Sequence, residues 1–206
     1  YGRKRIFSYG MSLYTFSSLL CAFAASVPQL LFFRALQGIG SSMIYGTNIA
    51  ILISVFPLKE RGKVLGINVA STYLGLSLGP IVGGLLTQYL GWRSLFLINI
   101  PFGLLAIFLV FRKLKGEWAE AKGEKLDLTG SLILSMAIAL LTFGLSTNLW
   151  LSLTGAAGIF LFIWWEKRVE NPVLKISLFT GNRVFAFSNL AALINYSATF
   201  AVGFLL

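Results

Sequence analysis

The sequence predicts an all-α membrane protein with about seven transmembrane helices. Hydrophobic residues make up 57% of the 206 residues and charged residues only 12%, well below the roughly 25% that is usual in soluble domains. Apolar stretches long enough, or almost long enough, to cross a bilayer recur along the chain between polar breaks. No stretch alternates polar and apolar residues with a period of two, which argues against a membrane β-barrel.

The expected helices follow these apolar stretches. In chain order they cover residues 6–26, 30–56, 64–90, 95–111, 128–147, 149–165 and 184–206. The fourth and sixth are at the short end of the spanning range. Short polar breaks at 91–93 and 147–148 predict tight turns before them.

The basic residues predict the orientation. If the chain starts in the cytoplasm and the helices alternate, 15 of the 17 basic residues fall in cytoplasmic loops. They are Arg3, Lys4, Arg5, Lys59, Arg61, Lys63, Arg112, Lys113, Lys115, Lys122, Lys125, Lys167, Arg168, Lys175 and Arg183. This is the positive-inside pattern of membrane proteins, with residues 1–5 cytoplasmic. The net charge of +10 therefore indicates topology, with contact to anionic lipid as a second role, and we expect no nucleic-acid partner.

The remaining reactive residues exclude several kinds of chemistry. The chain has no histidine and one cysteine, Cys21, so a metal site of the Cys/His type and an intrachain disulfide are excluded. All seven acidic residues lie in the cytoplasmic loops. No nucleophile is paired with a base and no phosphate-binding loop is present. We expect neither enzymatic activity nor a cofactor.

The ends of the chain predict an internal fragment of a larger membrane protein. The first residue is Tyr1 rather than Met, and it stands beside a basic loop. The last residues continue an apolar helix. We expect the missing helices of the same protein to be partners of this segment.

The second expected helix carries an ordered set of polar residues. Arg34, Gln37, Ser41, Tyr45 and Asn48 are spaced by three or four positions, which places them in one stripe. Lipid cannot satisfy such a stripe, so it should face protein or a water-filled cavity. The alternative for Arg34 alone is snorkelling to the outer membrane interface.

Polar residues and glycines lie on one face of the third expected helix. These residues are Asn68, Ser71, Thr72, Gly75, Gly79 and Gly83. The glycines recur every four positions and form a groove. Pro80 lacks a backbone donor and predicts a kink. Ordinary small-residue packing between membrane helices explains the glycines equally well.

The later expected segments carry fewer residues that indicate a particular function. Pro101 and Gly103 should loosen the fourth helix in its middle. The helices at 128–147 and 149–165 are almost purely apolar, which suits a lipid-facing position. The basic, amphipathic stretch 172–179 predicts either a helix lying on the inner membrane surface or an ordered linker.

The motifs, taken in order, resemble those of the major facilitator superfamily, and most closely its fourteen-helix drug/proton antiporters. Gly2, Arg3, Lys4 and Arg5 resemble the end of the cytoplasmic signature between family helices two and three. Residues 30–40 resemble the helix-four motif with its buried arginine. Residues 75–86 resemble the antiporter motif, and match at Gly75, Gly79, Pro80, Gly83 and Gly84. Residues 92–103 and 171–179 resemble two further stretches of the drug exporters.

The resemblance covers essentially the whole chain and implies a domain organisation. Residues 1–111 would form family helices 3–6 of the N-terminal half. A cytoplasmic loop (112–127), an extra central helix pair (128–165), a cytoplasmic amphipathic linker (166–183) and the start of the C-terminal half (184–206) would follow. About seven of fourteen helices would then be present.

The resemblance also implies a function in the cell membrane. The chain would belong to a proton-coupled exporter of small lipophilic or cationic compounds. Arg34 would take part in proton coupling, the glycine and proline motif would permit alternating access, and residues 2–5 would belong to a cytoplasmic gate. Cavity-facing candidates are Gln37, Ser41, Tyr45, Asn48, Asn68 and Thr72. The membrane carboxylates that carry protons would lie outside this sequence. The alternatives are a nutrient importer of the same fold and a membrane sensor or assembly subunit that does not transport.

Overall fold

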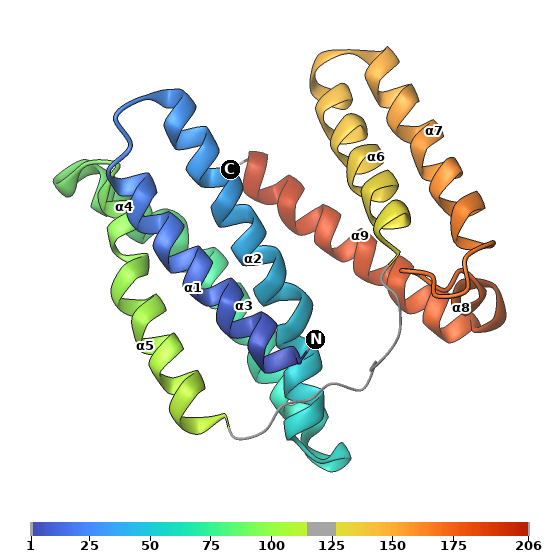
Figure 1. Cartoon of the computed structure of the whole chain (residues 1–206), viewed down its shortest axis with the longest axis horizontal. Helices are drawn as coiled ribbons and strands as arrows, with labels where there is room; N and C mark the ends of the chain where they lie inside the picture. Colours follow the sequence, from blue (N-terminus) through green and yellow to red (C-terminus); the bar gives the residue numbers. More distant parts are fainter. Residues whose placement is uncertain (1, 115–126, 206) are drawn as a thin grey trace. The chain divides into compact units, whose positions relative to one another are not determined.

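The computed structural model describes residues 2–114 and 127–205, and every regular element within them is a helix (Figure 1). The chain divides into two compact units, Tyr1–Lys122 and Gly123–Leu206. Five helical stretches are long and apolar enough to span a membrane: Val27–Val55, Leu58–Leu90, Ser94–Lys113, Leu128–Thr147 and Leu149–Glu166. The first and last of the expected segments are also helices, of 20 and 23 residues. The predicted all-α membrane fold is confirmed.

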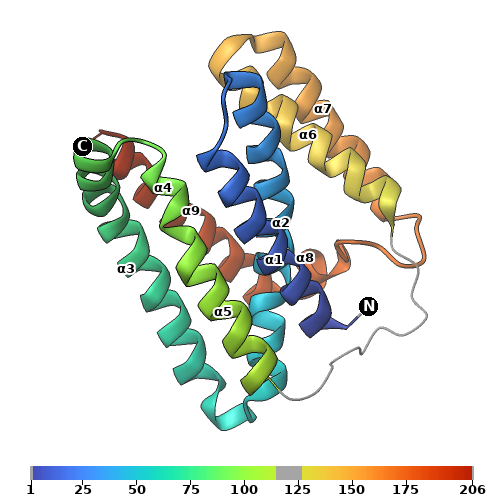
Figure 2. The same cartoon turned by 60° about the vertical axis from the view of Figure 1, so that its left-hand side comes forward.

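The first unit is built around its N-terminal helix. Its helices are α1 (Arg3–Ala22), α2 (Val27–Val55), α3 (Leu58–Leu90), α4 (Ser94–Leu97) and α5 (Asn99–Lys113). Helix α1 packs against α2, α4 and α5, as Figures 1 and 2 show from two sides. Helix α3 contacts only α2 and α4 among the described elements. The longest helix is therefore the least packed helix of the first unit.

Small and polar residues line the buried face of α1. This face includes Ser8, Gly10, Thr15, Ser17 and Ser18. Each hydroxyl donates to a backbone carbonyl of its own helix, usually four residues earlier, so no buried donor is left unpaired. Such residues let membrane helices approach closely.

The closest approach joins α1 and α2 at two glycines. A Cβ added to Gly40 would lie 2.7 Å from the backbone nitrogen of Tyr14 and 2.9 Å from the carbonyl oxygen of Gly10. A Cβ added to Gly10 would lie 2.7 Å from the Cβ of Met43. Thr15 similarly fills the space beside Gly103 of α5. Bare backbone at these positions sets the spacing of the bundle.

Local sequence signals explain where the helices start and end. Ser26 caps α2 by accepting a hydrogen bond from the backbone N–H of Gln29, and Pro28 stands in the first turn, where no helical donor is needed. Helix α3 ends at Gly91, whose φ of 80° suits a residue without a Cβ. The predicted turn at 91–93 follows.

The fourth expected segment is interrupted earlier than its sequence suggests. The sequence predicts loosening at Pro101 and Gly103, but the regular helix breaks at Ile98, between α4 and α5. Pro101 has no N–H to donate to the carbonyl four residues before it, so the helix loses a hydrogen bond at Leu97. The break therefore falls one turn ahead of the proline.

Apart from Arg34 and Arg93, the described basic residues of the first unit lie at one end of the bundle. Arg3, at the start of α1, donates to the Ser54 hydroxyl near the end of α2 at 2.5 Å. At the opposite end, Arg93 donates to the carbonyl of Ala24 at 3.1 Å. The α2–α3 turn and the end of α5 lie at the same end as Arg3 (Figure 1).

The second unit begins with a tight helical hairpin. Helices α6 (Leu128–Thr147) and α7 (Leu149–Glu166) are joined through Asn148, which caps α7. A Cβ on Gly158 would lie 2.8 Å from the Cβ of Ala137, and Gly144 and Gly155 also face the partner helix. Small residues therefore form the contact face of this pair.

The segment after α7 is an ordered linker rather than a surface helix over 172–179. Helical structure is limited to α8 (Ser177–Gly181), followed by α9 (Arg183–Leu205). The carboxylate of Glu166, only 3% exposed, accepts hydrogen bonds from the backbone N–H groups of Val173 and Leu174 at 3.2 and 3.4 Å. Since Glu166 fixes these two groups from outside the segment, and Pro172 precedes them, residues 172–176 stay non-helical.

Candidate transport site

Helix α2 supplies most of the candidate site, because its polar residues reach three neighbouring helices. The expected stripe does not point in one direction. Its upper part, Arg34 and Gln37, turns toward α1 and α4. Its lower part, Asn48, turns toward α3.

The upper part is a short chain of hydrogen bonds. The Arg34 guanidinium donates to the side-chain oxygen of Gln37 at 2.7 Å. The amide nitrogen of Gln37 donates to the Ser18 hydroxyl on α1 at 2.6 Å. Gln37 is 3% exposed, whereas Arg34 is exposed. An exposed charge is thus connected to a buried helix interface.

Arg34 also lies beside an aromatic ring of α4. Its guanidinium carbon is 5.9 Å from the centre of the Phe96 ring, at the outer limit of a cation–π contact. A guanidinium has five N–H donors, and its Nη1 nitrogen is the one that donates to Gln37.

The lower part is an amide pair between two helices. The Asn48 side-chain nitrogen donates to the side-chain oxygen of Asn68 on α3 at 3.0 Å. Thr72, one turn further along α3, donates to the Asn68 carbonyl at 3.0 Å. In a membrane, such a contact between helices is favoured because lipid offers no alternative partner.

The other expected cavity-facing residues remain on open surface. Tyr45 is 74% exposed, Thr72 is exposed, and Ser41 is half-buried. The Ser41 hydroxyl donates to the carbonyl of Gly38 within its own helix. Ser41 and Tyr45 form no cluster with Arg34 or with Asn68, whereas the Thr72 hydroxyl donates to the backbone carbonyl of Asn68 within α3.

The glycine face of α3 is unpacked within the described residues. A Cβ added to Gly75, Gly79 or Gly84 would meet no atom within 4 Å, and one on Gly83 would meet only Leu95, at 3.6 Å. Helix α3 has no buried residue and continues through Pro80 without interruption. Space for another helix is therefore present along this face.

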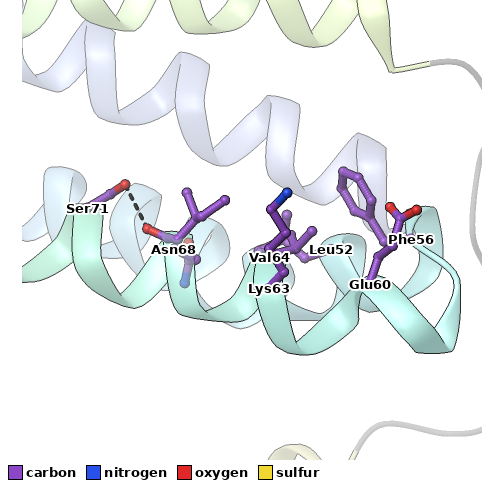
Figure 3. Close-up of a pocket in the computed structure, with 8 residues that line it drawn as sticks. Leu52, Phe56, Glu60, Lys63, Val64, Asn68 and Ser71 are labelled. Atoms are coloured by element: carbon purple, nitrogen blue, oxygen red, sulfur yellow. Dashed lines mark hydrogen bonds between the residues drawn. The ribbon is translucent and has the colours of Figure 1, made fainter.

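A cleft of about 680 Å³ lies between the end of α2 and the start of α3 (Figure 3). Its lining residues are Leu52, Phe56, Glu60, Lys63, Val64, Ile67, Asn68 and Ser71. Its volume is in the range of small-molecule sites. The lining is mostly apolar, with the polar residues Asn68 and Ser71 at one end and the charged residues Glu60 and Lys63 near the α2–α3 turn.

The residues expected to form the cytoplasmic gate, 2–5, stand at the start of α1 and not in a loop. Gly2 is buried at the N-cap, and Arg3 links α1 to α2. Lys4 and Arg5 line a second cavity of about 360 Å³ that reaches Phe111 of α5. All four residues thus lie at the end of the unit where the basic residues gather.

Three residues of these networks are not evident from sequence reasoning. Ser18 belongs to an apolar stretch, Phe96 is one of many aromatic residues, and the sequence predicts a loop at Glu166. The seven- and three-residue spacings of Ser8, Thr15 and Ser18 are the signal that would have placed Ser18 on an inner face of α1.

Comparison with known proteins agrees with the order of motifs. A family model described as Major Facilitator Superfamily matches residues 1–206. The chain is 34% identical over 190 residues to the Multidrug resistance protein Stp of Mycobacterium tuberculosis (strain CDC 1551 / Oshkosh), covering 87% of this chain and 35% of that protein. It is 34% identical over 214 residues to Multidrug resistance protein 3 of Bacillus subtilis (strain 168), covering 98% and 41%.

A further relative has a different named activity. The chain is 30% identical over 209 residues to the Riboflavin transporter RibZ of Clostridioides difficile (strain 630), covering 100% of this chain and 46% of that protein. The chain therefore spans less than half the length of each of these relatives. The resemblance stated from the motifs is confirmed, and the chain belongs to the major facilitator superfamily of multi-pass membrane transporters.

Proposed function

We propose that this chain is part of a proton-coupled exporter of small lipophilic or cationic compounds that works by alternating access. The observation that carries the proposal is the contrast within the first unit. Helices α1 and α2 are locked together at Gly10 and Gly40, whereas α3 has no buried residue and an unpacked glycine face. A rigid pair beside a loosely held helix suits a transporter in which one part rocks against another.

The proposed roles follow the contacts. Arg34, anchored by Gln37, would polarise or pair with a proton-carrying carboxylate from another part of the protein. Gly75, Gly79, Pro80, Gly83 and Gly84 would form the surface on which α3 packs and pivots. Gly2, Arg3, Lys4 and Arg5 would stabilise the cytoplasmic side, where Arg3 already joins α1 to α2.

The proposed orientation places residues 1–5 in the cytoplasm. It is supported by the gathering of basic residues at one end of the first unit, since such residues are enriched on the cytoplasmic side. Residues 1–111 would belong to the N-terminal half, 128–165 would be a central pair, and 184–206 would begin the C-terminal half. The connecting segments 112–127 and 166–183 would be cytoplasmic.

Substrate-dependent proton movement is the direct test. The full-length protein is reconstituted into liposomes that contain a pH-sensitive dye, and the lipophilic cation tetraphenylphosphonium is added. We expect proton flux opposite to substrate flux, and none in protein-free liposomes. Absence of any substrate-dependent proton movement would instead support a sensor or assembly subunit.

Uptake of a nutrient is the second candidate, because one relative is named a riboflavin transporter. The same liposomes distinguish the two functions. Riboflavin movement without movement of tetraphenylphosphonium would replace multidrug export with vitamin transport. The two outcomes require no assumption about the proton carrier.

A bulky residue on the glycine face tests the role of α3. We expect Gly79→Leu to leave folding intact, because no described atom lies within 4 Å of its Cβ, but to reduce export roughly tenfold or more by blocking helix approach. Export is measured in cells at matched expression.

The matched control is Gly66→Leu. Gly66 is on the same helix and also has no neighbour within 4 Å, but it lies on the opposite face of α3. It should transport normally. Equal export by Gly79→Leu and wild type would remove the packing role of the glycine face.

A further inference from the structure

The cleft between α2 and α3 has a chemical gradient along its length. Leu52, Phe56, Val64 and Ile67 form its apolar walls. Glu60 and Lys63 stand at the end next to the α2–α3 turn, and Figure 3 shows both projecting to the same side as Phe56. A carboxylate and an ammonium group therefore face one apolar trough.

The two charges are available to a ligand. Glu60 and Lys63 are three residues apart in one helix, so they share a face. Both are exposed, and within the described residues no hydrogen bond or ion pair engages either charged group. The Arg61 side chain instead donates to the carbonyl of Phe56 at 3.2 Å and holds the turn that forms the end of the cleft.

The position of the cleft defines its surroundings. It opens at the end of the first unit where Arg3, Lys4 and Arg5 lie, which the positive-inside rule assigns to the cytoplasmic leaflet. In that leaflet, the charged end of the cleft lies level with the lipid headgroups, and its apolar part lies level with the acyl chains.

We propose that this cleft binds a zwitterionic phospholipid of the cytoplasmic leaflet that carries a primary ammonium group. The lipid phosphate accepts hydrogen bonds from Lys63, and the lipid ammonium donates to Glu60. One acyl chain lies against Leu52, Val64 and Ile67. The inference does not depend on the exported substrate, because it concerns a resident lipid beside α3.

The charges also define what the cleft disfavours. A phosphatidylcholine headgroup has no N–H and cannot donate to Glu60. Phosphatidylglycerol has no cation for Glu60 to bind. A lipophilic monocation is attracted by Glu60 but repelled by Lys63. A phosphatidylethanolamine headgroup satisfies both side chains at once.

Lipid retention by the full-length protein tests this assignment. The protein is purified in mild detergent with equal amounts of phosphatidylethanolamine, phosphatidylcholine and phosphatidylglycerol, and bound lipid is counted by native mass spectrometry. We expect about tenfold preference for phosphatidylethanolamine, the effect of one charge-assisted hydrogen bond. Equal retention of the three lipids would overturn the proposal.

Two variants distinguish the roles of the two charged side chains, and a third serves as the control. Glu60→Gln should remove the preference over phosphatidylcholine, whereas Lys63→Gln should weaken retention of all three lipids. Lys59→Gln is the matched control, because Lys59 is in the same turn of α3 but does not line the cleft. A loss with Lys59→Gln as large as that with Lys63→Gln would show a general charge effect and contradict the site.

Competition identifies the source of the bound group. Phosphoethanolamine without acyl chains should not displace the lipid, because the apolar trough is then left empty. Tetraphenylphosphonium should not displace it either. Displacement by the first would show headgroup binding without the trough, and displacement by the second would make the cleft a substrate site. Either result contradicts a resident lipid.

Discussion

Arg34→Ala should abolish proton-driven export while leaving the protein folded and in the membrane. Arg34 is exposed, so its removal creates no cavity in the α1–α2 packing. It does remove the donor that holds the Gln37 oxygen at 2.7 Å and the positive charge beside Phe96. The loss of a charge-assisted interaction predicts at least a roughly tenfold decrease in transport.

Arg93→Ala is a matched control for this prediction. Arg93 is at the same end of the unit, donates to a carbonyl at 3.1 Å and lies 4.4 Å from the Trp92 ring centre. It therefore resembles Arg34 in its contacts but is outside the α2 stripe. We expect Arg93→Ala to lower thermal stability modestly and to retain coupled export.

Arg34→Lys adds a finer comparison. Lysine keeps the charge but lacks the planar fork of donors, so it cannot contact Gln37 and a carboxylate in the same geometry. Export by this variant should fall between those of Arg34→Ala and wild type. Unchanged proton-coupled efflux in Arg34→Ala would show that Arg34 only snorkels to the outer interface.

The helices of this chain follow directly from its apolar stretches. A bilayer forces every spanning segment to satisfy its own backbone, so a long apolar run has little choice but a helix. The turn at Gly91 also follows from the local sequence, because a glycine there permits the positive φ. Helix existence is thus a local property of the sequence.

The contacts between helices are not a local property. The stripe on α2 predicts which residues share a face, but not that Gln37 would turn to Ser18 while Asn48 turned to Asn68. A stripe of 100° or more can face two neighbours, and the choice depends on where those helices pass. Periodicity cannot supply that information.

The linker after α7 shows a second limit on what can be predicted from the sequence. Its residues are amphipathic, which favours a surface helix, but the buried carboxylate of Glu166 captures two backbone N–H groups seven and eight residues later. A tertiary hydrogen bond here overrides a local preference. Sequence position alone predicts a loop at Glu166, because an acidic residue after an apolar run normally marks the membrane boundary.

Gly40→Ala should have the largest effect on folding of any single methyl group added to α2. The new Cβ would lie 2.7 and 3.0 Å from the backbone nitrogen and Cα of Tyr14. Backbone cannot rotate away as a side chain can, so α1 and α2 must separate. Overpacking of this kind costs about 1–3 kcal/mol, and we expect a clear fall in melting temperature, measured by size-exclusion of heated, detergent-solubilised full-length protein.

Gly38→Ala, two residues away on the same helix, should act in the opposite direction. No atom lies within 4 Å of its added Cβ, and replacing an exposed helical glycine by alanine gains about 0.5–1 kcal/mol. The difference in sign isolates the helix contact, because both variants change helix propensity equally. If both raised stability, α1 and α2 would not be in close contact, and the proposed rigid pair against which α3 moves would have no basis.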